Sequence, residues 1–133
     1  MYMYYPTNYV WSMAVVASLN NGGFIDEIDK AARPALEASQ QGDDVGTELL
    51  YSSWKAVAAG LLAAAETDEA RGWKLSASDK YYRAALYTSQ AERLQSPKWE
   101  GRKAAYQKSI DLLLKHVELG GIPVTTVDVP YAG

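Results

Sequence analysis

The spacing of apolar positions divides most of this chain into helices. The most regular stretch lies near the middle, and its apolar residues recur at helical spacing up to about Arg71. Asp43 or Asp44 is expected to cap the start of this helix. The apolar positions that define it are Leu50, Trp54, Val57, Ala58, Leu61, Leu62 and Ala65.

Two shorter helices are expected before this stretch. The first would be capped by Thr7 or Asn8 and would end at the sequence NNGG, residues 20–23. The second would run from about Phe24 to Gln40, and Pro34 should kink it or divide it into two short pieces.

Two further helices are expected after it. The first of these would begin at Ser76, whose hydroxyl could cap the amide of Asp79, and would continue through KYYRAALYTSQAERL. The other would run from about Pro97 to Leu119 and stop at the glycine pair 120–121. We therefore predict an all-α bundle of about five helices over residues 1–121.

Residues 122–133 follow a different pattern. The stretch TTVDVPYAG is rich in β-branched residues, which predicts a strand followed by a turn at Pro130. A strand without a partner is a hazard for aggregation, so this pattern favours a partner segment outside the helical region.

Composition narrows the class of protein. A length of 133 residues fits one domain, and a net charge of −3 without any Lys/Arg cluster argues against a nucleic-acid partner. The absence of cysteine removes disulfides and thiolate chemistry and is compatible with a cytoplasmic location, which we expect. The longest apolar run, residues 56–65, covers about half of a bilayer crossing, so no membrane partner is expected.

No catalytic constellation can be recognised in the sequence. There is no G-x-S-x-G elbow and no phosphate-binding glycine loop. The acidic groups DEID (26–29) and GDDVG (42–46) lack the spacing of a calcium loop and are interpreted as helix-start charges and solvated faces. His116 is the sole histidine and is expected at the surface near a helix C-terminus. We therefore predict no catalytic residue, no metal site and no cofactor in this chain.

Aromatic residues give the composition its clearest bias, with 10 Tyr and 4 Trp against a single Phe. Such side chains suit half-buried or ligand-holding surfaces, although packing between helices is the simpler explanation. One face of the fourth helix also combines an aromatic with small residues, which permits either close helix packing or space for a ligand. That face consists of Tyr81, Ala84, Ala85, Thr88 and Ala91.

From about Ala70 onward the chain resembles the N-terminal helical region of one branch of the α/β-hydrolases. This branch includes 2,6-dihydroxypseudooxynicotine hydrolase and FrsA-like esterases. The resemblance rests on RGWKLSASDKYYRAALYTSQAERL, YQKSIDLL and VTTVDVPYAG. The helical positions that match are Gly72, Ser76, Ala77, Tyr81 or Tyr82, Arg83, Ala84 and Tyr87. The segment that leads into the first hydrolase strand matches at Val127, Val129, Pro130, Tyr131 and Gly133.

The resemblance implies a helical cap domain that covers the active site of an α/β-hydrolase catalytic domain, carried by the same or a separate chain. The catalytic triad would lie outside these residues. Related enzymes hydrolyse esters or carbon–carbon bonds next to a ketone, often in aromatic or polyketide-like small-molecule substrates. A cap without its catalytic domain would expose an apolar face, and a homodimer is an alternative way of covering that face. The residues expected near a substrate are Tyr4, Tyr5, Trp11, Tyr81, Tyr82 and Tyr87.

Two interpretations of other classes stay open. One is a TPR-like protein-interaction module, although its repeat of about 34 residues does not recur here. The other is a stand-alone helical bundle that binds a small aromatic ligand.

Overall fold

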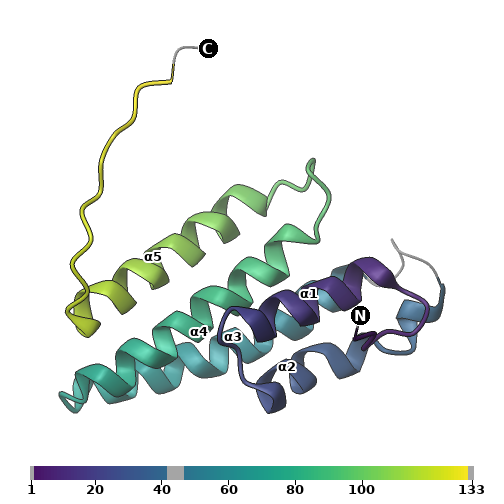
Figure 1. Ribbon diagram of the computed structural model, residues 1–133, viewed down its shortest axis with the longest axis horizontal. Coiled ribbons are helices and arrows are strands. Elements are labelled where there is room, and N and C mark those ends of the chain that lie inside the picture. Colours follow the sequence, from purple (N-terminus) through teal and green to yellow (C-terminus); the bar gives the residue numbers. More distant parts are fainter. Residues whose placement is uncertain (1, 42–46, 132–133) are drawn as a thin grey trace.

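The computed structural model describes residues 2–41 and 47–131, and within them the chain is an all-α bundle (Figure 1). The prediction of about five packed helices is therefore confirmed. The α-helices are α1 (Tyr9–Asn20), α2 (Ile25–Ala32), α3 (Thr47–Ala70), α4 (Lys74–Arg93) and α5 (Arg102–Gly120), and two 3₁₀ helices, η1 (Arg33–Ala35) and η2 (Ala38–Gln41), follow α2.

The start of the chain follows the predicted signals closely. Of the two candidate caps for α1, Asn8 takes the role, because its side-chain oxygen accepts a hydrogen bond of 3.0 Å from the amide of Trp11. Pro34 stands at the first turn of η1, so the second predicted helix is divided into an α-helix and short 3₁₀ pieces, as expected.

The long helices α3, α4 and α5 run alternately up and down, and α4 lies between the other two (Figure 1). The turn from α3 to α4 is tight and needs Gly72 in the left-handed region, with φ of 79°. Helices α1 and α2 pack beside α3 and α4 at one end of the bundle.

Two predicted helix starts were wrong. Helix α4 begins at Lys74, and the hydroxyl of Ser76 donates a hydrogen bond to Asp68 instead of capping the helix. Helix α5 begins at Arg102 instead of about Pro97, because residues 96–102 form turns closed by backbone hydrogen bonds. The cap predicted for α3 at Asp43 or Asp44 lies outside the described residues.

The predicted strand does not form among the described residues of the C-terminal segment. Helix α5 stops at the glycine pair as predicted, with Gly121 in the left-handed region at φ of 64°. Residues 122–131 then leave the bundle without regular structure (Figure 1). A strand needs a neighbouring strand to satisfy its backbone, and the described helices present no sheet edge.

The core consists of two clusters that share α3 and α4. The larger one joins the N-terminal segment, α1 and α2 to the first part of α3, around Trp54, and the last part of α4, around Tyr87. The smaller one joins the end of α3, α4 and α5 around Tyr81 and Leu112. Within the described ranges, no helix is long and apolar enough to cross a membrane.

Candidate functional site

The aromatic residues of the N-terminal segment form one packed group. The ring of Tyr5 lies edge-on to the rings of Tyr4 and Trp11, with centroid distances of 5.0 and 5.6 Å. Tyr5 is fully buried, and its hydroxyl donates to the carbonyl oxygen of Ala32 at 2.7 Å. Tyr4 is partly exposed and donates to Asp29 at 2.6 Å. Burial, together with this bond to a carboxylate, raises the pKa of Tyr4 to about 12.

Tyr87 and Tyr81 are also core residues. The ring of Tyr87 packs on Trp54 at 5.8 Å, and its hydroxyl donates to Glu27 at 2.8 Å. The hydroxyl of Tyr81 donates to Glu69 at 2.6 Å. Burial is the main cause that raises the pKa of both phenols, followed by these bonds to carboxylates. With their rings packed and their hydroxyls paired, both side chains serve the fold in this conformation.

Tyr82 differs because it lines a groove of about 190 Å³ between α4 and α5. Its hydroxyl donates to the carbonyl oxygen of Asn21 at 2.8 Å. The groove also contains the half-exposed ring of Tyr106 and the side chains of Leu86 and Leu113. The six residues predicted near a substrate therefore fall into separate groups and do not line one common cavity.

The small-residue face of α4 is used mainly for helix packing. Ala84, Ala85 and Ala91 are buried among neighbouring helices, which is the simpler of the two interpretations of that face. Ala85 also borders the groove that Tyr82 lines.

His116 is half-buried, so its predicted surface position was wrong. Its Nδ1 atom lies 2.9 Å from Ser78 Oγ and 3.1 Å from the carbonyl oxygen of Ser78. Because the Ser78 hydroxyl donates its hydrogen to the carbonyl oxygen of His116, Nδ1 must carry the hydrogen that it shares with Ser78. The serine is buried and its hydrogen is committed to the backbone, so this pair locks α5 onto α4 and does not form a nucleophile with its base.

A buried ionic network joins α2 to α4. The guanidinium of Arg83 donates from Nε to Glu27 at 2.9 Å and from Nη1 to Asp79, and the Phe24 ring lies 4.2 Å from it. Glu27 also accepts the hydroxyl of Tyr87. The sequence predicts a solvated helix-start charge at Glu27. The residue does stand in the first turn of α2, but its side chain is largely buried, so the prediction of a solvated face is wrong here. No sequence pattern identifies its partner 56 residues away.

A second set of charges links the end of α3 to α4 and α5. Lys80 binds Asp68, and Lys115 binds Glu69 at 2.8 Å. These hydrogen bonds are the main cause that lowers the pKa of both carboxyl groups. Among the described side chains, no three metal-binding groups come together, and these carboxylates are occupied by lysines.

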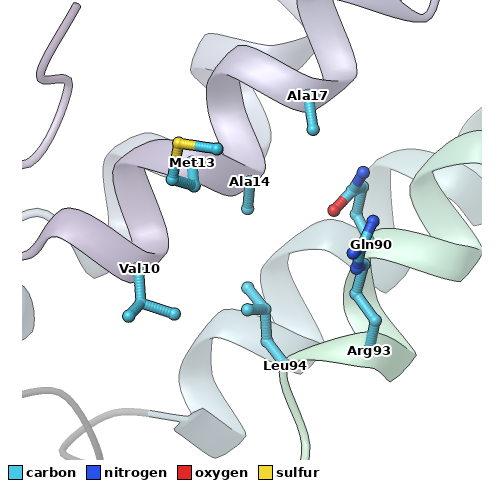
Figure 2. Close-up of a pocket in the computed structure, with 7 residues that line it drawn as sticks. All are labelled: Val10, Met13, Ala14, Ala17, Gln90, Arg93 and Leu94. Atoms are coloured by element: carbon cyan, nitrogen blue, oxygen red, sulfur yellow. The ribbon is translucent and has the colours of Figure 1, made fainter. Parts of the chain in front are cut away.

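A cavity of about 170 Å³ lies between α1 and α4 (Figure 2). Its walls are mostly apolar, but Gln90 points its carboxamide oxygen into the space. Sequence reasoning missed this cavity, because α1 carries no charged residue that would mark one face as distinct. The residues that line it are Val10, Met13, Ala14 and Ala17 from α1, Gln90 and Arg93 from α4, and Leu94, which caps the end of α4.

Comparison with known proteins identifies no relative of this chain. The chain matches no protein-family model, no curated protein and no solved structure.

Proposed function

We propose that this bundle is the cap domain of an α/β-hydrolase, whose catalytic domain supplies the nucleophile, acid and histidine. The substrate would be an ester, or a ketone cleaved at the neighbouring carbon–carbon bond, in an aromatic or polyketide-like compound. The described residues offer no nucleophile paired with a base, so chemistry would have to come from the partner domain.

The C-terminal segment is the observation that carries this proposal. Its apolar side chains are turned to solvent, with Val129 80% and Tyr131 93% exposed. Val124 and Val127 are also exposed, and within the described residues 123–131 no backbone hydrogen bond joins the segment to the bundle. An extended segment rich in β-branched residues is suited to adding a strand to a sheet edge, where its backbone and its valines would both be buried.

The groove between α4 and α5 gives further support. A cap domain acts by excluding water and by adding apolar and aromatic walls to the substrate pocket. Tyr82 and Tyr106 supply such walls, and Leu113 and Leu114 on α5 are exposed enough to meet a second domain. Tyr82 is therefore the residue that we place nearest the substrate among the six predicted from sequence. Substrate contact by the other five residues stays a prediction, because it depends on how a catalytic domain docks. These residues are Tyr4, Tyr5, Trp11, Tyr81 and Tyr87.

The test is to isolate the protein from its native source and compare its mass under native and denaturing conditions. A fluorophosphonate probe, which labels activated serines, is added before separation. We expect the label on a hydrolase-sized polypeptide that either contains this sequence or stays bound to it. Hydrolysis of aryl esters and of β-diketones then identifies the reaction.

A matched pair of variants tests the role of the segment. Substituting lysine for Val127 and Val129 should weaken binding to the labelled polypeptide, whereas substituting lysine for the exposed Leu75, at the start of α4, should leave it unchanged. A single unlabelled species of about 14.6 kDa in both mass measurements would refute the proposal.

A further inference from the structure

The cavity between α1 and α4 has the size and chemistry of a ligand site. The short side chains of Ala14 and Ala17 leave the space between the helices unfilled, and Leu94 closes its opposite side (Figure 2). Met13 and Val10 are partly exposed at the rim, so the cavity communicates with solvent there. An apolar cavity of about 150 Å³ is enough to hold a benzene-sized molecule. At about 170 Å³ this one admits a single six-membered ring with one small substituent.

Gln90 marks one position in the cavity as polar. The residue is 3% exposed, and its Oε1 atom has no hydrogen-bond partner among residues 2–41 and 47–131. Figure 2 shows this oxygen directed into the space bounded by Ala14, Ala17 and Leu94. A buried acceptor without a donor costs about 1–3 kcal/mol. An apolar side chain would avoid that cost, so the unpaired oxygen points to a donor that arrives from outside the described residues.

Water is a poor candidate for that donor. An ordered internal water is held by about 2–4 polar partners. Here the polar side chains are the carboxamide of Gln90 and, at the border, Arg93, and the remaining walls are alkyl or thioether groups, so a water would have at most the lower end of that number. Arg93 forms no ion pair within the described residues and lies at the border of the cavity. A guanidinium there can rest against the face of an aromatic ring.

We propose that this cavity binds a small, neutral phenol. Its ring lies between α1 and Leu94 in contact with the thioether of Met13, and its hydroxyl donates to Gln90 Oε1. Methionine suits this position because its flexible side chain can move to admit a ring and then pack on it. The inference goes beyond the proposed function and does not depend on it, since the cavity is formed by α1 and α4 alone.

The experiment is an NMR titration of the full chain with phenol and, separately, with toluene, observed at the Met13 methyl group. Phenol should shift this signal and give nuclear Overhauser contacts between ring protons and Met13. The informative quantity is the ratio of the two dissociation constants, because phenol also loses hydrogen bonds to water on binding. In Gln90→Leu the ratio should move about tenfold in favour of toluene, as expected for the loss of one hydrogen bond.

Two further variants separate the site from general effects. Gln107→Leu removes an exposed glutamine of α5 and should leave the ratio unchanged. Ala17→Leu fills the cavity and should abolish binding of both ligands. The proposal is overturned if phenol leaves the Met13 methyl unmoved, if it acts on the groove around Ile110 instead, or if Gln90→Leu keeps the wild-type ratio. None of these results bears on whether a catalytic domain binds the bundle, so the two proposals fail separately.

Discussion

Replacing Arg83 with methionine should destabilise the bundle far more than removing an arginine from its surface. The Arg83 side chain is 7% exposed and that of its partner Glu27 is 15% exposed. Methionine retains most of the aliphatic stem but leaves the Glu27 carboxylate without its cation. The comparison variant is Arg33→Met, since Arg33 is 72% exposed and pairs with Asp29 one turn away.

The magnitude follows from what remains around Glu27. Removing one member of a buried ion pair costs about 3–5 kcal/mol. Glu27 keeps the hydrogen bond from Tyr87 and stands in the first turn of α2, where a helix favours negative charge. We therefore expect the lower end, about 3 kcal/mol. For Arg33→Met the expected loss is within about 1 kcal/mol, because water already solvates both groups.

Urea unfolding followed by tryptophan fluorescence measures both losses. Trp54 is fully buried and packs on Tyr87 beside the network, so its emission reports on this part of the core. The midpoint of thermal unfolding should fall by about 10 °C in Arg83→Met. The double variant Glu27→Gln with Arg83→Met should recover most of the loss, because the neutral amide leaves no buried charge unmatched and its oxygen still accepts the hydroxyl of Tyr87.

Equal losses in Arg83→Met and Arg33→Met, to within about 0.5 kcal/mol, would refute this reasoning. Such a result would mean that Arg83 reaches water and that its contacts with Glu27 and Phe24 contribute little. A double variant as unstable as Arg83→Met alone would show that lost packing, and not unpaired charge, sets the cost.

Two further predictions concern the phenols and the glycines. The pKa values of Tyr5 and Tyr87 are raised in the folded state, so their neutral forms add stability that is complete below their ordinary pKa of 10.0 and is lost as pH rises past it. Tyrosinate absorbance should therefore rise in two steps as the pH is raised, and the later step should coincide with loss of helical circular dichroism. A single step would contradict this prediction. Gly121→Ala places a side chain in the left-handed region and should lower the free energy of unfolding by about 1 kcal/mol. Gly60→Ala, inside α3 with open space around it, should raise that free energy by about as much, and thermal unfolding measures both changes. Equal effects of the two substitutions would contradict the assignment of the α5 terminus.

The helices could be predicted because each one carries a local signal. The periodic apolar positions of α3, the cap at Asn8, the break at Pro34 and the stop at Gly121 act within one or two turns. The start of α4 was predicted two residues late because Ser76 had an alternative partner. Its hydroxyl donates to Asp68, eight residues away along the chain, and accepts from Lys80, so the oxygen that a cap would use is already bonded.

The polar contacts could not be predicted, since they depend on how the helices are placed. Composition pointed to the tyrosines but does not distinguish a buried, hydrogen-bonded phenol such as Tyr87 from a groove residue such as Tyr82. Glu27 and Arg83 each look like ordinary surface charges in sequence, and their pairing appears once α2 lies against α4. Gln90 is the extreme case, because its buried oxygen has no partner in the part of the chain that the structure describes.

These features meet on α4, and its position explains why. The helix lies between α3 and α5 and also touches α1, so ten of its 20 residues are buried, four of which are not hydrophobic. A helix enclosed in this way cannot send its polar side chains to water, and each of them needs an internal partner. Arg83 finds Glu27, Ser78 finds the backbone of His116, and Glu92 finds Arg102. Among the described side chains, the carboxamide oxygen of Gln90 is left without one. It lies beside a cavity, on the helix that also borders the groove of Tyr82. The same enclosure that stabilises the bundle therefore places both candidate binding surfaces on the flanks of α4.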